Sequence, residues 1–146
     1  MKIFLDANIL VTVLNKEYPV FPYAAKLLSL ADQPQYKLVT SPICLAIAFY
    51  FAEKKSGRAV ALKKIKLLCS KVDVVPVDAE VVMQTLANKT ITDFEDGLEY
   101  YAAKQTKCSC MVTEDGTDFS FSEIEVLRAE EFLVKYGKYK SYKSKV

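Results

Sequence analysis

The sequence predicts an α/β layer fold with a mostly parallel sheet, and three observations support this prediction. Short apolar segments alternate along the chain with longer segments of helical periodicity. The first short segment, Ile3-Phe4-Leu5, is apolar on both faces, which is typical of a central strand covered by helices on both sides. With 146 residues, 51% of them hydrophobic and 26% charged, the chain is expected to form one domain around one core.

The composition also limits the class of protein. No apolar run approaches the ~20 residues of a membrane span, so no membrane association is expected. The amino terminus leads straight into a strand without a secretory segment, which favours a cytoplasmic protein. The last twelve residues carry five lysines and no acid, whereas residues 1–134 carry 15 basic and 18 acidic residues. We therefore expect a single domain over 1–134 and a basic tail rich in tyrosine and lysine over 135–146.

The first third of the chain is expected to contain two helices after the first strand. The apolar spacing of residues 9–14 predicts a helix that begins directly after Asp6 and ends before Tyr18-Pro19. Pro22 suits the first turn of a second helix, which Gln33-Pro34 ends.

The next segments predict a strand over 38–40 and two further helices. Ser41 followed by a proline is an N-cap signal, and the helix over about 42–55 is nearly all apolar, so we expect it to be buried on most sides. Gly57 separates it from a helix over about 58–70, whose apolar residues share one face.

A strand is then expected over 72–77, followed by a helix that Asp78 caps. Thr92 and Glu95 fit the capping box S/T-x-x-E, so they predict the start of a helix that continues to about Gln105. The last part of the chain is expected to hold a strand at 110–113, an edge strand at 124–126 and a helix at 129–136.

Acidic residues recur where these elements meet one edge of the sheet. Asp6 ends the first strand, and Asp96 lies in the first turns of the 92–105 helix with Asp93 one turn before it. Asp115 and Asp118 follow the fourth strand. Ligands bind outside the carboxyl ends of strands in open α/β sheets, so we expect these acids to gather there.

Such carboxylates suit a divalent metal and the hydrolysis of phosphate esters. Mg²⁺ and Mn²⁺ prefer oxygen ligands and can activate water. The chain contains no histidine, which excludes a Ser-His-Asp or Cys-His mechanism. The alternative is a purely structural role, because acids are also favoured at the first turn of a helix and in turns. This alternative is favoured for Asp93, Glu95 and Glu114. Glu95 and Asp96 are about 100° apart around the helix, so we expect only one of them to face the site.

Two stretches, FLDANIL and TDFEDGLEYYAAKQTKCSCMVTEDGTDF, resemble the PIN domain family, and more narrowly the single-domain, toxin-type (VapC-like) PIN proteins of bacteria. The resemblance runs from Lys2 to about Leu133. It implies a three-layer α/β/α sandwich around a parallel sheet of four to five strands. It also implies an endoribonuclease that uses Mg²⁺ or Mn²⁺ held by three or four acids.

The resemblance assigns roles to individual residues. Asp6 and Asp96 match the first two acids, and either Asp115 or Asp118 matches the acid after the fourth strand. Asn8 and Thr113 match positions that support these acids. The resemblance further implies RNA as substrate, a homodimer, and an antitoxin protein that enters the acidic groove.

One departure from the family pattern leaves a second function open. The family carries a glutamate in the helix after the second strand, but the matching position is near Ile47, and Glu53 lies six residues further on. The alternative is a non-catalytic PIN module that binds RNA or a protein partner. A phosphotransferase of the haloacid dehalogenase type fits less well, since that family needs a second Asp where this chain has Asn8.

The tail offers a candidate nucleic-acid contact. Lys138, Tyr139 and Lys140 combine cationic groups, which neutralise phosphates, with an aromatic ring on which a base can stack. The alternative is a solvated, frayed terminus.

Overall fold

The computed structural model describes residues 1–138 and has the predicted α/β architecture. The elements follow in the order β1 (Lys2–Leu5), α1 (Ala7–Asn15), α2 (Phe21–Ser29), η1 (Leu30–Asp32), β2 (Lys37–Thr40), α3 (Pro42–Ser56), α4 (Arg58–Cys69), β3 (Asp73–Val74), α5 (Ala79–Ala87), α6 (Phe94–Gln105), β4 (Cys110–Val112), η2 (Gly116–Phe119), β5 (Glu125–Leu127) and α7 (Ala129–Lys135). Five strands form one sheet in the order β3-β2-β1-β4-β5, and every neighbouring pair is parallel.

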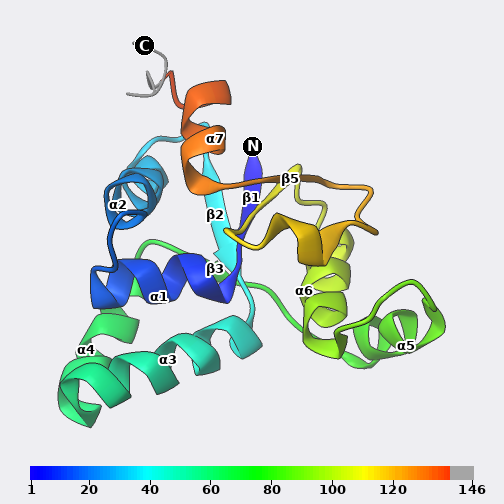
Figure 1. Cartoon of the computed structure of the whole chain (residues 1–146), viewed down its shortest axis with the longest axis horizontal. Helices are drawn as coiled ribbons and strands as arrows, with labels where there is room; N and C mark the ends of the chain where they lie inside the picture. The colour runs from blue at the N-terminus through cyan, green and yellow to red at the C-terminus, as the bar shows by residue number, and fades with distance from the viewer. Residues whose placement is uncertain (139–146) are drawn as a thin grey trace.

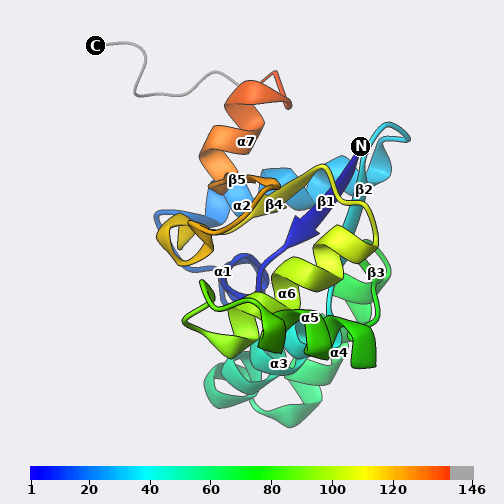
Figure 2. The ribbon, with the colours of Figure 1, turned by 90° about the vertical axis from the view of Figure 1, so that its right-hand side faces the viewer.

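Helices cover the sheet on both sides, which confirms the expected three-layer fold (Figures 1 and 2). Helices α2 and α7 pack together on one side, and α5 and α6 pack together on the other. Helix α1 packs against α2 and α3, and α3 packs against α4. Parallel strands need such crossover helices, so the alternation of elements in the sequence leads directly to these layers.

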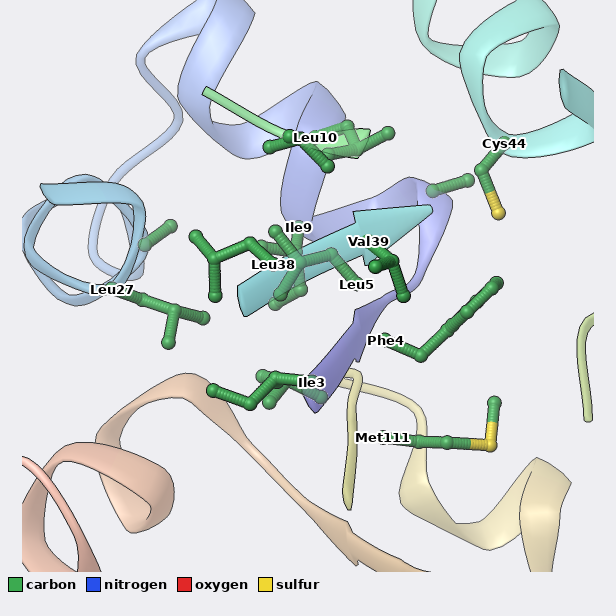
Figure 3. Packing of buried hydrophobic residues seen from close by; sticks show 14 of the residues in the cluster. Ile3, Phe4, Leu5, Ile9, Leu10, Leu27, Leu38, Val39, Cys44 and Met111 are labelled. Carbon is green, nitrogen blue, oxygen red and sulfur yellow. The ribbon is translucent and has the colours of Figure 1, made fainter. Parts of the chain in front are cut away.

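The core is built around β1, the middle strand of the sheet. Ile3, Phe4 and Leu5 are fully buried, as expected for a strand that is apolar on both faces. Figure 3 shows these side chains with Leu38 and Val39 of the neighbouring strand. Burying each large apolar side chain contributes about 1.5–3 kcal/mol, so this strand is a main source of stability.

The carboxyl ends of β1 and β4 meet at one edge of the sheet. Leu5 is in register with Val112, and the next residue, Asp6, donates its backbone N–H to the Val112 carbonyl at 3.0 Å. Thr113 follows β4 at the same level. The local sequence therefore places Asp6 directly beside the loop that carries Asp115 and Asp118.

Two expectations, one about α3 and one about β3, are wrong. Helix α3 buries only one face, made of Cys44, Ala48 and Ala52, because it packs on α1 and α4 and leaves Tyr50 and Phe51 exposed. Strand β3 comprises only Asp73–Val74, shorter than the expected 72–77, because its partner β2 ends at Thr40, which pairs with Val74. Pro76 also has no N–H with which to continue the ladder.

The helix caps agree with the sequence in two cases and differ in a third. Ser41 and Asp78 accept hydrogen bonds from the backbone of α3 and α5, as expected of N-caps. The expected capping box of Thr92 and Glu95 is wrong, since Asp93 is the N-cap of α6 and accepts from the Asp96 N–H at 3.2 Å. The carboxylate at position 93 therefore starts the helix one residue later.

The carboxyl-terminal part packs on the body as far as it is described. Helix α7 ends at Lys135, and the Tyr136 carbonyl accepts a hydrogen bond from Tyr36 Oη at 2.8 Å. The division into a 1–134 domain and a 135–146 tail stays a prediction. Within residues 1–138, no helix is long and apolar enough to cross a membrane.

Candidate metal centre

A cavity of about 480 Å³ opens at the carboxyl edge of β1 and β4. Carboxylates dominate its polar lining, and among the described residues that border it none is lysine or arginine. The acidic members are Asp6, Glu17, Asp93, Glu95, Asp96, Asp115 and Asp118. The fold thus brings together acids from three separate regions of the sequence, as expected.

Asp6 forms the buried end of this cavity and is only 7% exposed. It is the N-cap of α1, and its Oδ1 accepts from the Ala7 N–H at 2.6 Å. Its Oδ2 accepts from Thr113 Oγ1 at 2.7 Å. Both carboxylate oxygens are therefore fixed in place, and the amino-terminal end of α1 favours the negative charge.

Asn8 and Thr113 connect Asp6 to the loop after β4. The Asn8 amide donates to Thr113 Oγ1 at 2.9 Å and to Asp115 Oδ2 at 3.1 Å. Thr113 Oγ1 also accepts from the Asp115 N–H at 3.1 Å. These contacts connect Asp6 and Asp115 through Asn8 and Thr113; the supporting role of these two residues stays a prediction.

Asp115 and Asp118 both border the cavity, although the sequence left open which of them does so. They start and continue η2, in which the Asp118 N–H donates to the Asp115 carbonyl at 3.0 Å. This tight turn places two residues three apart on the same side of the loop. Glu114, between β4 and this turn, does not border the cavity.

Helix α6 adds acids from its first turn. Burial, and then the charges of Asp93, Asp6 and Asp118, raise the pKa of Asp96 to about 7. Burial and the charge of Asp93 also raise the pKa of Glu95. The expectation that only one of Glu95 and Asp96 faces the site is wrong: the end of the helix faces the cavity, so neighbouring residues of its first turn both border it.

Glu99 is a further acid at this site, and the sequence analysis did not identify it. It lies on α6 and is fully buried, and Cys44 Sγ donates to its Oε1 at 3.1 Å. Ligand atoms of Asp6, Cys44 and Glu99 all lie within 4.8 Å of one another. Burial and the charge of Asp6 raise the pKa of Glu99 to about 11. The sequence signal is its i,i+3 spacing from Asp96, which puts both on one helix face.

The remaining predicted positions lie apart from the acids or beyond the described chain. Ile47 borders the cavity from α3, at the point where the family pattern has a glutamate, whereas Glu53 pairs with Arg58 at 3.9 Å outside it. Lys138 is exposed and does not border the cavity. Tyr139 and Lys140 lie outside the described residues.

The donor set fits a hard divalent cation. The cavity offers carboxylate oxygens from β1, α6 and the loop after β4, and the most buried of them is already oriented by hydrogen bonds. Burial, and after it repulsion from the neighbouring acids, raises the pKa of Asp96, and a bound cation would relieve that repulsion. Among the described residues, the only group of three or more side chains with ligand atoms within 4.8 Å of one another is Asp6, Cys44 and Glu99. Mg²⁺ or Mn²⁺ held by Asp6, Asp96, Asp115 and Asp118 would therefore keep several waters among its ligands.

Known proteins share this sequence pattern. The model of the PIN domain family matches residues 2–117. Ribonuclease VapC1 of Aquifex aeolicus (strain VF5) is 25% identical over 140 residues, covering 93% of this chain and 96% of the relative.

Solved structures share the fold. VapBC2 of Rickettsia felis, bound to a DNA fragment from its promoter, superposes with a TM-score of 0.67 at 21% identity, covering 88% of this chain and 98% of that one. VapC20 of Mycobacterium tuberculosis, described as a sarcin–ricin loop cleaving toxin, has a TM-score of 0.64 at 18% identity, covering 84% and 98%. Together with the family match over most of the chain, these likenesses lead to one conclusion: this chain belongs to the PIN domain family.

Proposed function

We propose that this chain is a metal-dependent endoribonuclease of the PIN type and the toxin component of a toxin–antitoxin pair. The observation that carries the proposal is the convergence of Asp6, Asp96, Asp115 and Asp118 on one cavity without a neighbouring cationic side chain in its described lining. Family membership and the similarity to a ribonuclease support it. The substrate is RNA, and the reaction is hydrolysis of a phosphodiester bond.

The chemistry divides between the cation and the chain. Mg²⁺ or Mn²⁺, when bound, lowers the pKa of water and offsets negative charge on a phosphate oxygen. Asp6 and Asp115 are held in fixed orientations through Thr113 and Asn8, so they need little reorganisation to bind the cation. Burial and the neighbouring acids raise the pKa of Asp96 to about 7, so Asp96 would give up its proton in order to bind the cation.

The direct test is RNA cleavage by metal-stripped protein with and without Mn²⁺. Total RNA and a sarcin–ricin loop oligonucleotide serve as substrates, because a structural relative is named for cleaving that loop. We expect cleavage only with the metal, and loss of it in Asp6→Asn. Glu80→Gln is the matched control, because Glu80 lies exposed in the first turn of α5, outside the cavity. Absence of metal-dependent cleavage by the folded wild-type protein would refute the proposal.

The second candidate is a non-catalytic PIN module that binds RNA or a protein partner. It is favoured by Ile47, since α3 contributes no carboxylate to the cavity. RNA binding without metal-dependent cleavage, equal in the wild type and Asp6→Asn, would select this function.

We also propose an antitoxin protein and a second copy of this chain as partners, in the cytoplasm. Exposed aromatic residues on α3 and at the start of α6, namely Tyr50, Phe51 and Phe94, leave apolar surface for such contacts. Co-purification with the product of a neighbouring small gene tests the first partner. Light scattering of the purified chain tests the second, and a monomer at micromolar concentration would contradict the dimer.

A further inference from the structure

Glu99 is an unusual residue for a protein core. It lies in the middle of α6, its side chain is fully buried, and its ligand atom lies within 4.8 Å of one of Asp6, which borders the acidic cavity. Charged side chains are almost never fully buried unless a partner compensates them. Its position therefore calls for a compensating group.

The described surroundings supply only part of that compensation. Oε1 accepts the hydrogen bond from the Cys44 thiol, but Oε2 has no hydrogen-bond partner among residues 1–138. The carboxyl group faces Asp6, which is itself nearly buried, and ligand atoms of the two lie within 4.8 Å. Two carboxylates at this distance repel each other unless a proton or a cation lies between them.

We propose that Glu99 is a ligand of the divalent cation, which it shares with Asp6 at the buried end of the cavity, and that Cys44 is the positioning residue for Glu99. This inference rests on the proposed function. Helix α3 presents Ile47 to the cavity, so the inner carboxylate comes instead from α6, one turn beyond Asp96. The i,i+3 spacing puts Asp96 and Glu99 on one helix face, at the rim and at the base of the same site.

A buried neutral acid is the competing account, in which a proton lies between Glu99 and Asp6. The two accounts differ for Glu99→Gln. Glutamine keeps the shape and a hydrogen-bond donor toward Asp6, so it would replace a neutral acid at little cost. As a neutral amide, it cannot replace a carboxylate that binds a cation.

The test is Mn²⁺ binding to the full, metal-stripped chain, measured by calorimetry and by the electron paramagnetic resonance of free Mn²⁺. We expect Glu99→Gln to weaken binding at least tenfold, and Cys44→Ser to weaken it less because a hydroxyl still donates to Oε1. Glu80→Gln, with its exposed side chain, is the control that should bind as the wild type does. We also expect metal-free Glu99→Gln to melt at a higher temperature than the wild type, and to gain less from added Mn²⁺.

The outcomes separate this inference from the proposed function. If Glu99→Gln binds Mn²⁺ as tightly as the wild type while Asp6→Asn does not bind it, Glu99 is not a ligand, and the nuclease proposal stands. If the wild type binds no Mn²⁺, both fail. If circular dichroism shows that Glu99→Gln does not fold, Glu99→Met replaces it. Loss of Mn²⁺ binding in that apolar variant supports the inference, and retained binding overturns it.

Discussion

Thr113 shows how an uncharged residue can organise charged ones. Its hydroxyl oxygen donates one hydrogen bond to Asp6 and accepts two, from the Asn8 amide and the Asp115 N–H. A hydroxyl has one proton and two lone pairs, so every hydrogen-bonding position of this group is used. A single buried oxygen thus contacts the Asp6 carboxylate, the Asn8 amide and the Asp115 backbone.

We expect Thr113→Val to weaken Mn²⁺ binding by about 10–100-fold, because it removes these hydrogen bonds while keeping the shape of the side chain. The unfolding free energy should fall by about 1–3 kcal/mol, since buried polar groups lose their partner. Calorimetric titration and denaturant unfolding measure the two effects. Thr113→Ser retains the hydroxyl and should bind as the wild type does; an equal loss in both variants would contradict this role.

Asp96 makes the unfolding free energy of the metal-free protein depend on pH, and the direction of this dependence follows from its pKa. Its pKa is about 7 in the folded protein and lies near 3.9 in an unfolded chain. Between these values the folded state holds a proton that the unfolded state has lost, so this residue lowers metal-free stability as the pH rises.

We therefore expect metal-free Asp96→Asn to become increasingly more stable than the wild type from pH 4 to pH 7, by at most about 1.4 kcal/mol per pH unit. Above pH 7 the difference should stay constant, because the aspartate is ionised in both states. Urea unfolding in the presence of a chelator at several pH values measures it. A difference independent of pH would show that Asp96 titrates normally.

Helix α6 is the element that assembles most of the site. It carries Asp93 at its N-cap, Asp96 in its first turn and Glu99 one turn later. Close packing on α5 fixes its position: a Cβ at Gly97 would lie 2.5 Å from Thr85 Cγ2 and 3.0 Å from Ile91. Any larger residue at position 97 must therefore displace Thr85, Ile91 or α6 itself.

Gly97→Ala should therefore destabilise the protein by about 1–3 kcal/mol despite the better helix propensity of alanine. Thermal unfolding measures this loss. Thr85→Ser removes the methyl group that the new Cβ meets, so the double variant should recover most of the stability. Gly116→Ala is the control, because no atom lies within 4 Å of its added Cβ. A neutral Gly97→Ala would contradict the close approach.

Asp93 is the N-cap of α6, and substitution can show whether it also binds the cation. As the N-cap it needs only a side-chain oxygen, so Asp93→Asn should keep stability, whereas Asp93→Ala should lose about 0.5–2 kcal/mol. If Asp93 acts only as a cap, Asp93→Asn should also keep Mn²⁺ affinity within a few-fold. A large loss of affinity in the asparagine variant would make it a metal ligand. Thermal unfolding measures the N-cap effect and calorimetry measures Mn²⁺ affinity on the same samples, so together they distinguish a cap from a metal ligand.

For the molecule as a whole, charge is distributed unevenly. The net charge is only +2, yet seven carboxylates border one cavity. This concentration of negative charge would repel the proposed RNA substrate unless a cation reverses it locally. Metal binding should therefore control both stability and RNA affinity.

We expect Mn²⁺ at a hundred times its dissociation constant to raise the unfolding free energy of the wild type by about 2.7 kcal/mol, because only the folded chain assembles the site. A chelator should reverse the gain. Asp6→Asn should show little of it, and Glu80→Gln should show all of it. Denaturant unfolding with and without Mn²⁺ checks this expectation, and an equal gain in wild type and Asp6→Asn would place the ion elsewhere.

The sequence by itself determined the parallel α/β fold, the place of Asp6 at the end of the central strand, and the gathering of Asp96, Asp115 and Asp118 nearby. These features follow from local periodicity and from the rule that parallel strands end at one edge. The N-cap at Ser41 could be predicted because its signal is local. The N-cap of α6 was predicted one residue too early, because the adjacent residues Thr92 and Asp93 are both good N-cap residues.

Only the tertiary structure decided which side chains face one another across distant segments. The exposed outer face of α3, the shared cavity of Glu95 and Asp96, and the meeting of Cys44 with Glu99 all depend on how helices pack. Helical periodicity tells which residues share a face but not what lies against it. Glu99 lies 93 residues from Asp6 in the chain, so only the packing of α6 over the end of β1 could bring the two carboxyl groups together.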